Sequence, residues 1–63
     1  MKKLFRVAIE HYGNPEDGMV LLDTFTVKAA NEDVALEAAY DMAWEQYPDI
    51  GVLECGGIER VRA

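Results

Sequence analysis

The stretch that decides the fold runs from Asn31 to Tyr47 and reads NEDVALEAAYDMAWEQY. It predicts a helix, because it contains no Gly or Pro and is rich in Ala, Leu, Met, Gln and Glu, which are strong helix formers. Asn31 is a good N-cap residue, and Glu32 and Asp33 follow where the positive end of the helix dipole favours carboxylates. Pro48 ends the helix, since the residue before a proline is displaced from the α region.

The predicted helix has an apolar face and an acidic face. At about 100° per residue, the apolar face is centred on Ala35, Ala38, Ala39, Met42 and Ala43, with Leu36, Tyr40 and Tyr47 on one flank. The opposite face carries Glu37, Asp41 and Glu45, which are spaced about 6 Å apart along the axis. No Lys or Arg lies between them, although like charges at this spacing cost roughly a few tenths of a kcal/mol per pair. Trp44 lies beside this row and is either a lid over a core edge or an anchor for a partner.

The distribution of charge narrows the classes of partner. The chain has 63 residues, six basic and twelve acidic, and a net charge of −6. Residues 1–28 hold four basic and four acidic side chains, whereas residues 29–59 hold eight acidic side chains and no basic one. Binding to nucleic acid directly, or to an anionic membrane, needs clustered Lys and Arg, so the sequence argues against both. It permits a basic protein surface as partner, which such a field would attract and steer.

Length and composition predict a single domain, residues 1–63, located in the cytoplasm. The apolar fraction of 51% favours a folded chain over a disordered one. The single cysteine, Cys55, excludes an intramolecular disulfide and a multi-cysteine zinc site. No stretch approaches the roughly 18 apolar residues of a membrane-spanning helix, and no cleavage site of a signal peptide follows the basic start of the chain.

Residues 3–12 and 19–29 alternate between apolar and polar side chains and predict two strands, joined by a turn over residues 13–18. The first strand is expected to turn Phe5, Val7 and Ile9 to the core, with His11 as a further candidate. In the second strand, Leu21, Phe25 and Val27 are expected on one face, and Val20, Leu22, Thr24, Thr26 and Lys28 on the other. Asp23 interrupts the apolar face and indicates a bulge or a bend.

Residues 52–55 and 58–62 predict a third strand, interrupted by Gly56-Gly57. Glycines inside a strand indicate a bulge, although two in a row also permit a small hairpin with Gly-Gly at its turn. The order β-β-α-β then predicts an α+β fold: a three-stranded antiparallel sheet in the order 2-1-3, with one helix packed on one face. The helical crossover makes the third strand parallel to the second, which places the first between them.

No residue is predicted to be catalytic, and no metal ion or cofactor is expected. His11 lies beside Glu10, but a histidine at a strand end more often contributes to packing than to acid–base chemistry. Cys55 lies between Glu54 and Glu59, whose negative charges oppose formation of the thiolate that a nucleophile requires. The sequence therefore predicts a protein that is not an enzyme.

Residues 25–35, FTVKAANEDVA, resemble a strand-to-helix junction found in many small proteins of phages and mobile elements. The small size, the acidity and the β-β-α-β order are also similar to several anti-CRISPR proteins, over about residues 19–47. The resemblance implies an inhibitor that binds a subunit of a CRISPR effector in the cytoplasm of the host cell. An acidic member would occupy the basic groove meant for DNA or RNA.

Two hypotheses about function follow. In the first, the protein is an inhibitor whose acidic helix face substitutes for nucleic-acid phosphates on a basic surface. The residues expected to bind the partner are Glu32, Asp33, Glu37, Asp41, Trp44, Glu45 and Asp49. In the second, the chain forms a homodimer through an edge strand or an exposed sheet face containing Leu4, Val20 and Leu22, as a structural or assembly module, and its acidity only keeps it soluble.

Overall fold

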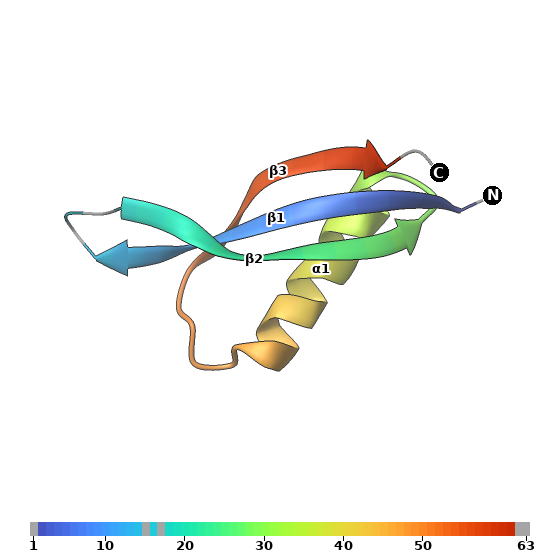
Figure 1. Ribbon diagram of the computed structural model, residues 1–63. Helices are drawn as coiled ribbons and strands as arrows, with labels where there is room; N and C mark the ends of the chain where they lie inside the picture. The colour runs from blue at the N-terminus through green and yellow to red at the C-terminus, as the bar shows by residue number, and fades with distance from the viewer. Residues whose placement is uncertain (1, 15, 17, 62–63) are drawn as a thin grey trace.

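The computed structural model describes residues 2–14, 16 and 18–61 and shows three strands and one helix in this part of the chain (Figure 1). The elements are β1 (Lys3–Asn14), β2 (Gly18–Ala29), α1 (Glu32–Gln46) and β3 (Leu53–Val61). Both neighbours of β1 pair with it in antiparallel fashion, so the sheet has the order β2-β1-β3. The predicted α+β architecture and strand order are confirmed.

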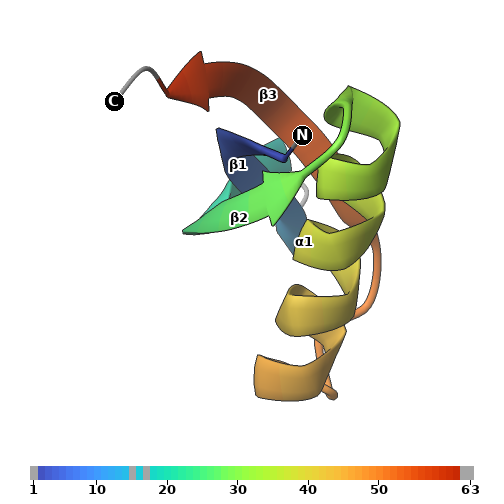
Figure 2. The ribbon, with the colours of Figure 1, turned by 90° about the vertical axis from the view of Figure 1, so that its right-hand side faces the viewer.

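Helix α1 covers one face of the sheet and leaves the other face uncovered (Figure 2). It begins as the sequence predicts: the Asn31 side-chain oxygen accepts a hydrogen bond from the Val34 N–H at 3.0 Å. At the other end the Tyr47 N–H donates to the Ala43 carbonyl at 2.8 Å. Pro48 follows directly, so the helix ends where a proline forces it to end.

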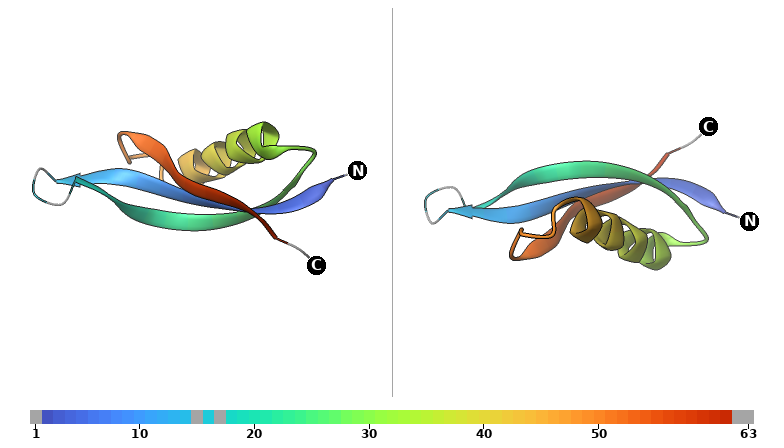
Figure 3. Two further views of the ribbon diagram at one scale, coloured as in Figure 1. Left: turned by 90° about the horizontal axis from the view of Figure 1, so that it is seen from above. Right: turned by 90° about the horizontal axis from the view of Figure 1, so that it is seen from below.

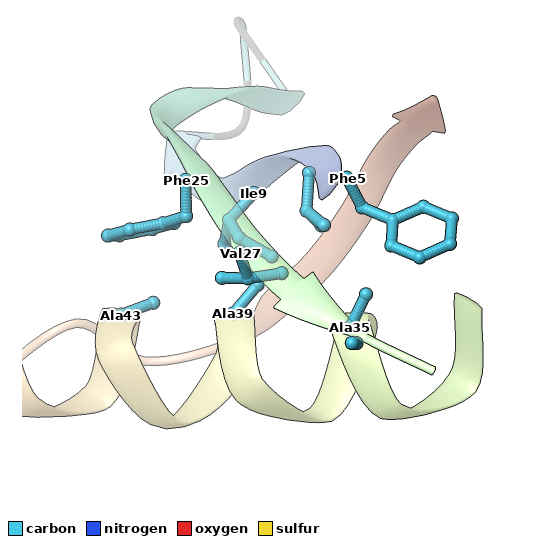
Figure 4. Close-up of a cluster of buried hydrophobic side chains, with 9 residues drawn as sticks. Phe5, Ile9, Phe25, Val27, Ala35, Ala39 and Ala43 are labelled. Carbon is cyan, nitrogen blue, oxygen red and sulfur yellow. The ribbon is translucent and has the colours of Figure 1, made fainter. Parts of the chain in front are cut away.

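Alanines bring the helix close to the sheet. Ala35, Ala39 and Ala43 are completely buried and lie one turn apart along α1 (Figure 4). They face Ala29 and a layer of larger side chains from the two strands above them: Phe5, Val7, Ile9, Phe25 and Val27. Small side chains on the helix and large ones on the sheet interdigitate, so a chain of this length can exclude water from a single core.

A bulge in β2 shifts its alternation by one residue. Ile9 pairs with Asp23 but Glu10 pairs with Leu21, so Leu22 is the extra residue. Leu22 is half-buried against the core, while Leu21 is 61% exposed. The expectation that Leu21 faces the core and Leu22 faces outward is therefore wrong, although Asp23 does mark an irregularity, as predicted. An extra residue exchanges the two faces of the strand beyond it.

A second bulge lies on the other side of β1. Ala8 pairs with Gly57 and Ile9 with Cys55, which leaves Gly56 unpaired and keeps β3 as one continuous strand. The bulge is thereby confirmed, and the alternative of a Gly-Gly hairpin is wrong. The predicted third strand also included residue 62, which lies outside the described residues, as do residues 15 and 17 of the predicted turn.

The tip of the β1–β2 hairpin projects beyond the rest of the molecule (Figure 3). The pairing of β3 with β1 stops at Leu53 and His11, whereas β2 follows β1 as far as Asn14 and Gly18. The molecule is accordingly elongated, with extents of 41 × 20 × 16 Å. The end of the hairpin therefore has no third strand beside it.

Substitution of Ala39 tests the close approach of helix and sheet. Ala39→Leu adds three carbon atoms at a site with no exposed surface, so the helix must move away from the sheet. We expect the free energy of unfolding to fall by about 1–3 kcal/mol, measured by chemical denaturation. Ala30→Leu, at an exposed position before the helix, should change it by less than about 0.5 kcal/mol. Equal effects of the two substitutions would contradict the packing described.

Candidate functional site

The acidic row of α1 points away from the sheet. Glu37, Asp41 and Glu45 are all exposed, and they lie on the side of the helix opposite the buried alanines. None of these three carboxylates makes an ion pair or a side-chain hydrogen bond with the described part of the chain. They form a line of unneutralised negative charge on a rigid element, as the sequence predicts.

Two large apolar side chains lie on the same side of the helix. Trp44 is 45% exposed and Val34 is 48% exposed, and helical spacing places them on either side of the acidic row. Trp44 therefore retains a large accessible surface instead of closing over the core. Val34 was not among the predicted site residues. Its position in the first turn, near Glu37 and Asp41, was the only signal that could have identified it.

The other predicted residues are distributed around the two ends of the helix. Asp33 is exposed in the first turn and begins the outward face. Glu32 is exposed as well but lies three residues before Ala35, hence on the side that turns toward the sheet. Asp49 is exposed in the turn after the helix, where the Ile50 N–H donates to the Tyr47 carbonyl at 3.2 Å. The site thus consists of Asp33, Glu37, Asp41, Trp44 and Glu45, with Glu32 and Asp49 beyond it.

The cations gather at one end of the sheet. β1 begins at the end where β2 and β3 finish (Figure 1), so this end receives Lys2, Lys3, Arg6, Lys28 and Arg60. In the described part of the chain the one ion pair joins Arg6 Nη1 to Glu59 Oε1 at 2.9 Å. The sequence did not predict this cluster, because its members come from three distant segments. The helix starts at the same end, and its acidic row runs away from these cations.

A shallow hollow of about 330 Å³ lies on the uncovered face of the sheet. Its lining residues are Arg6, Ala8, Thr24, Gly57, Ile58 and Glu59. Neither of the two nucleophilic or acid–base candidates lines it: His11 pairs with Leu53, and Cys55 pairs with Ile9. In the described residues no hydrogen bond joins His11 to Cys55, and no three His, Cys, Asp or Glu side chains are arranged to hold a metal ion.

A carboxylate of the sheet fixes the C-terminal end of the helix. The Tyr47 hydroxyl donates to Asp23 Oδ2 at 3.0 Å, and Asp23 Oδ1 accepts from the Thr24 N–H at 2.7 Å. The hydrogen bond to Asp23, the negative charge of Asp23 and partial burial together raise the pKa of the Tyr47 phenol above its ordinary value of 10.0. Asp23 therefore connects the bulge of β2 to the last turn that carries the acidic row.

Comparisons with protein-family models, with curated proteins and with solved structures found no match for this chain. Helix α1 is the one helix of the described residues, and it is too short and too polar to cross a membrane. The geometry of the acidic helix face, with its exposed Trp44 and Val34, is therefore the observation on which a function has to be based.

Loss of the Tyr47 hydroxyl tests the connection between helix and sheet. Tyr47→Phe leaves Asp23 without this donor, so we expect the midpoint of urea denaturation at pH 7 to fall. A phenol whose pKa is raised by folding stabilises the protein fully below pH 10.0, and this stabilisation disappears as the pH rises through the raised value. The gap between the wild type and Tyr47→Phe should therefore narrow above pH 10.0.

Tyr12→Phe provides the matched control for this prediction. Tyr12 is 52% exposed on the projecting hairpin and makes no hydrogen bond through its hydroxyl to the described residues. The denaturation midpoint of Tyr12→Phe should equal that of the wild type at every pH. A gap between wild type and Tyr47→Phe that stays constant from neutral to strongly alkaline pH would contradict the role of the Asp23–Tyr47 hydrogen bond.

Proposed function

We propose that this protein is a protein-binding inhibitor, not an enzyme, and that its acidic helix face occupies a basic, nucleic-acid-binding surface of another protein. The observation that carries the proposal is the row of Glu37, Asp41 and Glu45, exposed and unneutralised on a rigid helix. Like charges at this spacing oppose helix formation. A row kept free of Lys and Arg despite that cost is accounted for by a cationic partner.

The exposed apolar side chains support a specific contact over a purely electrostatic one. Aromatic anchors surrounded by polar residues are typical of the energetically dominant positions in protein interfaces. Trp44, on the same side as the acidic row, supplies such an anchor, and Val34 supplies a smaller one at the other end. The carboxylates then orient and accelerate the encounter, and the apolar contacts provide much of the affinity.

The partner class that fits best is a CRISPR effector subunit, in keeping with the anti-CRISPR resemblance of the sequence. Such effectors hold nucleic acid in a positively charged channel that contacts mainly its backbone. A helix presenting carboxylates about 6 Å apart meets those Lys and Arg side chains in place of phosphates. In this proposal the protein acts in the cytoplasm of the host cell and excludes the target DNA or RNA by competition.

Neutralising the row tests the proposal directly. Purified effector complexes loaded with guide RNA are assayed for binding to labelled target DNA, with and without the protein. We expect inhibition that weakens as salt is raised, and a loss of at least about tenfold for the triple variant Glu37→Gln, Asp41→Asn, Glu45→Gln. Trp44→Ala should weaken inhibition by a similar factor with less dependence on salt.

A second triple variant controls for net charge. This variant carries Glu10→Gln, Glu54→Gln and Glu59→Gln. It removes the same number of charges from the sheet and leaves the helix unchanged. It should inhibit like the wild type, because its carboxylates lie on the opposite face of the molecule. Equal inhibition by the wild type and the helix variant at all salt concentrations, or no binding to any effector, would refute the proposed function.

A further inference from the structure

The uncovered face of the sheet differs in charge from the rest of the molecule. The strand register places four cross-strand rows on it: Lys28–Leu4–Val61, Thr26–Arg6–Glu59, Thr24–Ala8–Gly57 and Leu21–Glu10–Glu54. These rows carry two cationic and three anionic side chains, whereas the whole chain has a net charge of −6. This face, hereafter the open sheet face, is therefore the broad surface on which two copies would repel each other least.

The charged side chains of the open sheet face lie at the two ends of the hollow. Arg6 leans toward β3 and pairs with Glu59 at 2.9 Å. Two residues beyond Ala8, the Glu10 side chain lies over Gly56, so closely that a Cβ there would come within 2.6 Å of the Glu10 Cδ. The floor between them, formed by Ala8 and Gly57, is left without a large side chain.

A large apolar side chain stands next to this empty floor. Leu21 occupies the row adjacent to the hollow and is 61% exposed. The bulge at Leu22 is what turns Leu21 to this side. One copy of the open sheet face therefore offers both an apolar hollow and an apolar projection, separated by about one row along the strands. Such a surface is complementary to itself when a second copy is turned end to end.

We infer that the open sheet face binds a second copy of this chain, with the two sheets stacked and their β1 strands antiparallel. With the axis at the Thr24–Ala8–Gly57 row, this orientation places Leu21 of the second copy over Thr26, beside the Arg6 end of the hollow, and Glu10 of the second copy over Arg6. A two-fold axis repeats both contacts. Glu59 approaches Glu54 of the second copy, and each Arg6 guanidinium lies between two carboxylates, Glu59 of its own copy and Glu10 of the second copy. The parallel orientation instead sets Arg6 against Arg6 and Glu10 against Glu10.

The strand edges are less suited to self-association. The regular part of β3 after its bulge runs from Gly57 to Val61, and a symmetric antiparallel pair centred on it would place the two Glu59 side chains opposite each other. At the other edge, the C-terminal half of α1 extends past β2 (Figure 1) and occupies the space beneath an added strand. Stacking through the open sheet face avoids both obstacles.

The dimer is expected to be weak. A footprint of three strands, each roughly eight residues long, covers about 400 Å² on each copy, which is below the roughly 800 Å² per partner of a standard interface. A dissociation constant in the micromolar range or above follows. The acidic helix faces stay on the two outer sides of the dimer, so this inference does not depend on the proposed function.

Charge reversal across the two-fold axis tests the geometry. Sedimentation equilibrium between roughly 10 µM and 1 mM should show the wild type approaching the mass of two 7.1 kDa chains. Arg6→Glu and Glu10→Arg should each remain monomeric, since each variant sets like charges against like. An equimolar mixture of the two variants should recover the dimer, because the carboxylate introduced by Arg6→Glu then meets the guanidinium introduced by Glu10→Arg.

Matched reversals away from the open sheet face serve as controls. Arg60→Glu and Glu37→Arg make the same charge changes at exposed positions and should leave the dimer intact, and circular dichroism verifies that every variant is folded. A wild type that stays at 7.1 kDa throughout would overturn the inference. The inference would also be overturned if the two single variants were monomeric and their mixture did not recover the dimer. Controls that are as monomeric as the two test variants would overturn it as well.

Discussion

The close contact between the three buried alanines of α1 and the sheet is the constraint on which the rest of the structure depends. Ala35, Ala39 and Ala43 have no exposed surface, so along this stripe only methyl groups project from the helix toward the sheet. Leu36, Ala38, Tyr40 and Met42 pack partly buried beside these alanines, and the opposite side of the helix is in contact with solvent. A helix held so firmly on one side can carry a row of like charges on the other without support from neighbouring cations.

Much of the fold was predictable because local signals agreed with one another. Asn31 and Pro48 bound the helix, its alanines define the inward face, and the alternation around Phe5, Val7 and Ile9 identifies the central strand. The strand order then follows from the helical crossover, which makes the third strand parallel to the second and places the first between them. Consistency of this kind between capping, propensity and pattern is what makes a short sequence specify one fold.

The side of the sheet that each residue of β2 faces beyond its bulge was not predictable, for a physical reason. Alternation has a period of two, so a single inserted residue exchanges the faces, and the sequence around Leu21, Leu22 and Asp23 is apolar on both possible faces. The gathering of the cations at one end was also hidden, since it depends on register between segments far apart in the chain. The outward acidic row, by contrast, depends only on helical spacing and was predicted correctly.

The two bulges have a joint consequence for the dynamics of the sheet. The extra residue Leu22 lies opposite the step from Ile9 to Glu10, and Gly56 lies opposite the step from Ala8 to Ile9, so the two bulges flank β1 about one residue apart. Beyond the bulges β3 stays paired with β1 as far as Leu53 and His11, and past that point only the two-stranded β1–β2 arm projects from the part of the sheet that the helix covers (Figure 3). Local opening begins where buried apolar contacts are fewest. Amide hydrogens of the arm would then exchange with solvent through local fraying, whereas those of the part of the sheet that the helix covers would exchange only through global unfolding.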